Sequence, residues 1–252
     1  VPSRFNSAAV SKSDTVTGAC ASATPGNLAG WHALQNRYGR LEFADVLKPA
    51  IELAKDGFPV SGFFTTLTRA SLGRIKDTEW RRVFRPDHDW QVGEVLQLHD
   101  LSETLSQIAA DGIGCLYGGA LGEKLVARIQ AGDGAISMDD LESVSPLWEA
   151  PISTSYRDQQ VNVPPPPAES FQVLLSLRIL ESFDFAQREP LSSAHLDLVF
   201  RVIRIAAGVR IQNNHKDLSV INALLSDVDE LVSRAGDGEP VVGPTENWAS
   251  GG

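Results

Sequence analysis

The sequence predicts a chain that contains both helices and strands, with helices predominating. Most of its apolar residues recur at the three- and four-residue spacing of amphipathic helices, and glycines separate these segments. Ile152 to Tyr156 and Gln160 to Val163 have the pattern of two strands, with Arg157-Asp158 near the turn between them. The 252 residues, 42% hydrophobic and 21% charged, suffice for a sizeable core and are typical of a globular protein.

The helical part is clearest between Thr24 and Val60. Pro25-Gly26 forms a turn signal, after which apolar residues at helical spacing run to Tyr38. Gly39 ends this helix and can supply the left-handed residue of a helix C-terminus, and Gly57 ends the next helix in the same way. One face of that second helix carries Phe43, Val46, Leu47, Ala50, Ile51 and Ala54. Before this pair, residues 15–23 are interpreted as a short strand or a surface loop.

Further helices follow up to residue 142. Asp100 and Glu103 resemble a capping box at the start of a helix that ends at Gly112. Another helix runs from about Leu116 to Ile129, and Ser137 with Asp140 caps a short one. Asp139-Asp140 is better explained by acids at a helix start than by paired catalytic carboxylates. His88 and His99 stand apart from other ligand types and are interpreted as surface residues.

Four prolines, Pro164 to Pro167, favour an extended segment that leads into an apolar helix. Ser192-Ser193 caps the next helix, predicted over 194–212. That helix is apolar on most sides, with Phe200 and Ile203 among its inward residues, so it is expected to be buried. His195 at its start is interpreted as a satisfied structural group. One more helical segment spans residues 218–234.

Charge and cysteine content exclude several classes of function. The net charge of −10 and the pI of about 4.9 disfavour nucleic acid and an anionic membrane surface as partners. No apolar run reaches membrane-spanning length. Cys20 and Cys115 form no CxxC pair, so no zinc or redox motif is expected, and a disulfide between them is left open. The first residues are neither a start methionine nor a leader, so we expect a processed or shortened polypeptide of unknown localisation.

Matched positions in the stretch from Thr24 to Val60 also resemble a known family. They are Pro25-Gly26, Gly30, Tyr38-Gly39, Leu41, Pro49-Ala50-Ile51, Leu53-Ala54, Gly57-Phe58 and Val60. This order resembles the large subunit of gamma-glutamyltransferase (gamma-glutamyltranspeptidase)-like enzymes, without the family's N-terminal segment. The resemblance implies an α/β (α+β) N-terminal-nucleophile hydrolase, an αββα sandwich completed by a small subunit. It also implies that residues 1–252 form a single domain.

The resemblance places the reaction on a partner chain. The family's precursor is a zymogen that cuts itself before a threonine, which then starts the small subunit of a heterodimer. Gly252 would be the processing junction, although an ordinary chain terminus would also explain the tail. The arginine that grips the substrate carboxylate would fall before residue 1, and Arg4 is the nearby candidate. No catalytic residue is expected on this chain, and no metal or cofactor is implied. A dimer of heterodimers is left open.

Three departures from the family pattern bear on the substrate. Ala168-Glu169-Ser170-Phe171 replaces small residues and a double glycine, Arg201 stands where a glutamate is usual, and Val209-Arg210 replaces an Asp-Arg pair. They favour a diverged hydrolase or acyltransferase of amides, such as a cephalosporin acylase, a small-acid amidohydrolase or a specialised-metabolite enzyme. The alternative is a non-catalytic helical binding protein derived from the family.

Overall fold

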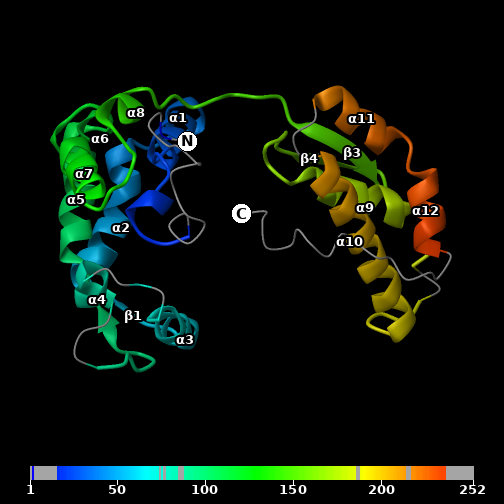
Figure 1. The fold of residues 1–252 in the computed structure, drawn as a ribbon, viewed down its shortest axis with the longest axis horizontal. Helices are drawn as coiled ribbons and strands as arrows, with labels where there is room; N and C mark the ends of the chain where they lie inside the picture. Colours follow the sequence, from blue (N-terminus) through cyan, green and yellow to red (C-terminus); the bar gives the residue numbers. More distant parts are fainter. Residues whose placement is uncertain are drawn as a thin grey trace. The chain divides into compact units, whose positions relative to one another are not determined.

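The computed structural model describes residues 2, 16–73, 75, 78–84, 88–185, 188–213 and 217–236. The chain divides into two compact units, Val1–Leu147 and Trp148–Gly252, and each is described by itself (Figure 1). That residues 1–252 form a single domain of a two-chain protein stays a prediction. In the described ranges, no helix has both the length and the apolar character needed to span a membrane.

The first unit is almost entirely helical. A short two-stranded ribbon pairs β1 (Phe58–Pro59) with β2 (Val95–Leu96) in antiparallel fashion. Its helices are η1 Ala19–Ala21, α1 Asn27–Tyr38, α2 Phe43–Asp56, α3 Gly62–Ser71, α4 Thr78–Phe84, α5 His99–Asp111, α6 Gly114–Tyr117, α7 Ala120–Gln130 and α8 Met138–Glu142. The 3-10 turn η1 stands where the sequence suggested a strand or a loop, so the strand prediction is wrong.

The predicted helix pair between Thr24 and Val60 is confirmed as α1 and α2. Helix α2 packs along α5, where the Ser102 hydroxyl donates to the carbonyl of Ile51 at 3.3 Å. The Tyr117 hydroxyl ties the start of α1 to α6, because it accepts from the Ala29 N–H at 3.0 Å and donates to the Pro25 carbonyl at 2.9 Å. The segment is therefore anchored at both ends by residues much later in the chain.

The two glycines that end α1 and α2 behave differently. Gly57 has φ +90°, a backbone conformation that favours glycine, and a Cβ there would overlap the Val95 side chain of β2. Gly39 instead has φ −73° in an extended conformation, so the predicted left-handed residue is wrong there. Helix α1 ends without a left-handed residue. Its last hydrogen bond runs from the Gly39 N–H to the Gln35 carbonyl at 2.7 Å. The glycines thus located both helix ends, but the predicted positive φ is found only at Gly57.

The two predicted N-terminal helix caps also have opposite outcomes. Ser137 and Asp140 form a complete capping box at α8, with both side chains bonded to backbone N–H groups, as predicted. Helix α5 begins at His99 without any side-chain cap, so the capping box at Asp100 is wrong. Asp100 lies in the first turn, where its carboxylate pairs with Arg82 at 3.2 Å and faces the positive end of the helix dipole.

Gly122 allows the close packing of α7 on α6, and we expect Gly122→Ala to destabilise the first unit. A Cβ at this buried position would overlap the backbone carbonyl of Leu116, which cannot move aside as a flexible side chain can. Overpacking of this kind costs about 1–3 kcal/mol. Urea unfolding measures the change. The matched control is Gly30→Ala in α1, which meets nothing within 4 Å and should gain about 0.5–1 kcal/mol.

The second unit packs helices on a two-stranded hairpin. β3 (Ile152–Tyr156) pairs with β4 (Gln159–Val163) in the register Ile152↔Val163 and Tyr156↔Gln159, which confirms the predicted hairpin. Arg157 and Asp158 both have positive φ, 46° and 64°, as a tight two-residue turn requires. The helices are α9 Phe171–Glu181, α10 Ser193–Asn213, α11 Leu218–Ser226 and α12 Asp229–Gly236.

Helix α9 is the centre of this unit's core. Its fully buried residues Phe171, Leu174, Leu175 and Ile179 pack with residues of α10 and α11. Helix α10 is buried on one side only, because Phe200 is 60% exposed and Ile203 is 40% exposed, so the prediction that these two face inward is wrong. The segment predicted as one helix over 218–234 is two helices that part at Asp227.

The proline run before α9 is not extended throughout. The Pro166–Pro167 peptide bond is cis and lies in a turn, which corrects the predicted extended segment. This turn brings residues 168–170 to the start of α9, where Ser170 donates to the Pro164 carbonyl at 3.2 Å.

Candidate functional site

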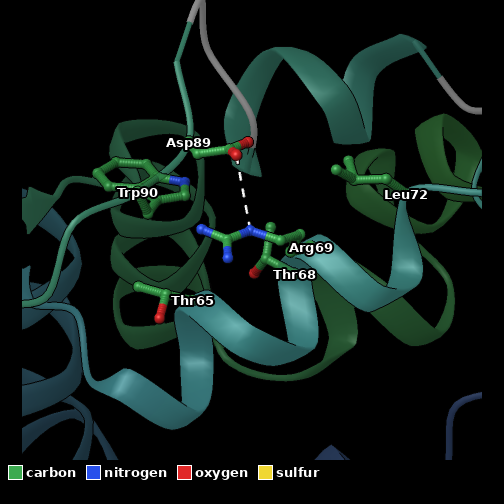
Figure 2. A pocket seen from close by; sticks show the side chains of 6 residues that line it. All are labelled: Thr65, Thr68, Arg69, Leu72, Asp89 and Trp90. Atoms are coloured by element: carbon green, nitrogen blue, oxygen red, sulfur yellow. Dashed lines mark ion pairs between the residues drawn. The ribbon is translucent and has the colours of Figure 1, made fainter.

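A shallow pocket lies on the first unit between α3 and the residues that precede β2 (Figure 2). Its lining consists of polar residues of α3, the leucine that follows the helix, and a carboxylate and a tryptophan opposite them: Thr65, Thr68, Arg69, Leu72, Asp89 and Trp90. In Figure 2 the Arg69 side chain extends from α3 toward Asp89, and the two form an ion pair at 3.6 Å between Nε and Oδ2.

Local contacts fix the two walls of this pocket. The Ser61 hydroxyl caps α3 by accepting from the Phe64 N–H at 3.1 Å, which sets the rotation of the helix. On the other wall, the Trp90 indole donates to the Phe84 carbonyl at 2.7 Å, and its ring lies edge-on to Phe64. These contacts hold the two walls of the pocket.

The chemistry that this pocket offers is limited to holding a small polar group. Both members of its ion pair are substantially exposed, so solvent screens their charges. Among the hydrogen bonds between residues of the described ranges, none joins a hydroxyl or thiol to a histidine ring, the pairing that activates a nucleophile. In the same ranges, no group of three or more His, Cys, Asp or Glu side chains is placed to hold a metal ion.

A second polar cluster joins the proline turn of the second unit to α10. The Arg210 guanidinium forms an ion pair with Glu169 through Nη1 and donates from Nε to the Gln172 side-chain oxygen at 2.8 Å. Arg210 is largely buried, with 16% of its side chain exposed, whereas Glu169 is about half exposed. Glu169 occupies the segment where the family resemblance led us to expect two glycines. The ion pair of Glu169 with Arg210 thus holds this segment against α10, although the two residues lie far apart in the sequence.

We expect Glu169→Gln to destabilise the second unit by about 0.5–1.5 kcal/mol, because a mostly buried guanidinium loses its charged partner. Urea unfolding at low and high salt measures the effect, which should shrink as salt rises. Asp45→Asn is the matched control, since the Asp45–Lys48 pair is exposed on both sides and solvent screens it, so its loss should change stability much less. Equal effects of the two substitutions would contradict this role of Glu169.

The residues that the sequence proposed for the substrate and for processing, Arg4 and Gly252, lie outside the described residues. His195 is a satisfied structural group, as predicted: its Nδ1 accepts from the Leu191 N–H at 3.3 Å, and its ring packs against Phe185. Arg201 pairs with Asp197 at 2.8 Å on the same helix.

The disulfide that the sequence left open is not formed, and His88 and His99 are surface residues as predicted. Cys20 and Cys115 are free, half-buried thiols. Burial, helped by the charge of Asp111, raises the pKa of the Cys115 thiol and so disfavours a reactive thiolate. His88 and His99 are exposed. The Gln91 N–H, with a smaller contribution from His88, lowers the pKa of the Glu94 carboxyl.

Comparison with known proteins places the chain in a family. The profile of the gamma-glutamyltranspeptidase family matches residues 2–234. The chain belongs to the gamma-glutamyltranspeptidase family. Relatives of this family include the glutathione hydrolase-like YwrD proenzyme of Bacillus subtilis, 35% identical over 167 residues, which cover 66% of this chain and 32% of that protein. The acylase ACY 1 proenzyme of Pseudomonas sp. (strain SE83) is 34% identical over 76% of this chain and 35% of its own length.

Solved structures of the family confirm the predicted fold class. The gamma-glutamyltranspeptidase of Helicobacter pylori matches 97% of this chain and 72% of its own chain with a TM-score of 0.82 at 21% identity. A cephalosporin acylase from Bacillus halodurans matches 84% of this chain and 41% of its own, with a TM-score of 0.71 at 25% identity. This chain spans about a third of the length of the curated relatives that it matches.

Proposed function

We propose that this chain is the large-subunit part of a proenzyme that is cleaved into two chains and then hydrolyses or transfers the acyl group of an amide. The observation that carries the proposal is the family match over residues 2–234, together with relatives whose names describe proenzymes of hydrolases and acylases. This chain contributes scaffold and part of the substrate pocket. The reaction takes place on a companion polypeptide, the small subunit, which begins with a threonine.

The proposed chemistry follows from what an N-terminal threonine offers. Its hydroxyl oxygen attacks the amide carbon while its free α-amine, whose pKa is about 7.7–8.0, accepts the hydroxyl proton. That proton passes to the leaving amine as the carbon–nitrogen bond breaks, which leaves an ester on the threonine. Water then releases the acid, or an acceptor amine takes the acyl group. Such a residue must be exposed by cleavage, and in this proposal Gly252 precedes the cleaved bond.

The relatives do not decide between two types of acyl group that this protein would transfer. The glutathione hydrolase-like relative and the acylase relative are almost equally similar, at 35% and 34% identity. The substitutions at Glu169, Arg201 and Val209 support a diverged member, including one of specialised metabolism. Arg4 is the proposed contact of a substrate carboxylate. A panel of gamma-glutamyl amides, acyl-cephalosporins and small amides ranks these substrates by kcat/KM.

The test of the proposal is the polypeptide content of the material purified from the full precursor. We expect denaturing electrophoresis to show two species, one that contains the sequence of this chain and a companion whose N-terminal sequence starts with Thr. A stable, uncleaved precursor without activity toward any amide would instead support a non-catalytic helical binding protein and would overturn the proposal.

A further inference from the structure

The pocket beside α3 contains a buried hydroxyl that no other described residue satisfies. Thr68 is 9% exposed and lines this pocket (Figure 2), and no hydrogen bond between described residues uses its hydroxyl. On the same helix, Thr65 and Thr66 each donate to the Gly62 carbonyl at 2.9 Å. A buried hydroxyl without a partner costs free energy, so folded proteins rarely keep one. A ligand that enters the pocket would supply this partner.

The adjacent Arg69 also has hydrogen-bond donors available for a ligand. Its Nε lies 3.6 Å from Asp89 Oδ2, which is longer than a hydrogen bond, and no hydrogen bond between described residues uses the guanidinium. A guanidinium carries five N–H donors in a planar fork that matches a carboxylate. The Arg69 side chain is 65% exposed, so a ligand can reach it from solvent. Arg69 and Thr68 therefore both offer donors to an acceptor oxygen in this pocket.

The charges that line the pocket select the class of ligand. Arg69 repels a simple cation, and Asp89 on the opposite wall repels a simple anion. A ligand that carries a carboxylate beside an ammonium suits both walls, because its carboxylate pairs with Arg69 and Thr68 while its ammonium pairs with Asp89. A carboxylate has about four lone-pair sites, so Asp89 can accept the ammonium and keep its ion pair with Arg69. Trp90 and Leu72 add apolar surface beside these polar groups.

We propose that this pocket binds the head group of a free α-amino acid. The pocket is shallow, so the head group enters it while the side chain of the amino acid stays in solvent. Binding therefore depends on the carboxylate and the ammonium and discriminates little among amino acids. All the lining residues belong to the first unit, so the inference does not rest on the proposed acyl transfer.

Fluorine NMR at Trp90 tests the site without any turnover. The protein purified from the full precursor is labelled with 5-fluorotryptophan, and Trp90→Phe identifies the Trp90 resonance among those of the five tryptophans. We expect glycine, added without an acyl substrate, to shift this resonance in a saturable way.

Three smaller compounds test the two halves of the head group. Acetate, methylammonium and acetamide each lack one or both charges, and we expect each to bind at least about tenfold more weakly than glycine. Binding of any of them as tightly as glycine would overturn the assignment to an amino acid. No saturable shift with glycine would mean that solvent alone fills the pocket and would overturn the site.

Thr68→Val separates ligand binding from a structural role of this residue. Valine has nearly the same shape but no hydroxyl to leave unpaired, so the ligand-free protein should keep or raise its Tm. The Kd for glycine should rise at least about fivefold, the effect of losing one hydrogen bond. Thr66→Val is the matched control and should leave this Kd unchanged, because the Thr66 hydroxyl is exposed and already donates to Gly62. A lower Tm or an unchanged Kd in Thr68→Val would overturn the proposal.

Discussion

Phe171→Ala is expected to lower the free energy of unfolding of the second unit by about 3–5 kcal/mol. Phe171 is fully buried at the first position of α9, where the chain enters the helix from the proline turn. It packs in the same cluster as Leu174, Val202 and Ile221, which are also fully buried. Removal of the ring leaves a cavity that these neighbours cannot fill, because they belong to three helices whose backbones hold them apart.

Hydrogen exchange in urea measures this effect separately for the two units. Peptides from residues 152–236 should lose protection at lower urea, while peptides from α2 and α5 should not. Phe200→Ala is the matched control, since it removes the same ring from a position that is 60% exposed, and should change stability by about 0.5 kcal/mol or less. A small effect of Phe171→Ala, comparable with that of Phe200→Ala, would contradict the placement of the core around α9.

Replacing the first threonine of the companion by alanine, in the precursor, is expected to abolish both cleavage and turnover. In the proposed mechanism, the substitution removes the hydroxyl that attacks the amide, and the same hydroxyl performs the cut that exposes the α-amine. Loss of a catalytic nucleophile typically lowers kcat by a factor on the order of 10³ to 10⁶. Denaturing electrophoresis follows the cleavage, and release of the amine from an amide substrate follows the turnover.

Threonine to serine is the control for this substitution, because it keeps a hydroxyl at the same place and should retain part of both activities. Survival of cleavage or turnover in the alanine variant would show that the nucleophile lies elsewhere. On this chain, the described residues show no hydroxyl or thiol bonded to a histidine ring.

Features with local causes could be predicted from the sequence. The capping box of Ser137 and Asp140 and the tight turn of Arg157-Asp158 need only residues that are neighbours along the chain. The apolar spacing of α1 and α2 likewise located both helices, and the residues matched around them identified the family. Each of these features rests on a short-range preference that tertiary contacts reinforce.

Features that depend on distant contacts could not be predicted. Phe200 and Ile203 continue the apolar pattern of α10, but the sequence does not say which side of the helix the core covers. The partners Arg210 and Glu169 meet only because the proline turn places residues 168–170 beside α10. The pocket between α3 and Asp89 has no motif either, since a single arginine and a single aspartate form its ion pair.

The central claim is that the acyl group is carried by the companion chain and not by this one. Intact-mass spectrometry of the two-chain protein, acid-quenched during turnover of its best amide substrate, tests it directly. We predict that the companion gains the mass of one acyl group, located on its first threonine, while this 27.2 kDa chain keeps its mass. An acyl group on this chain, with none on the companion, would contradict the claim.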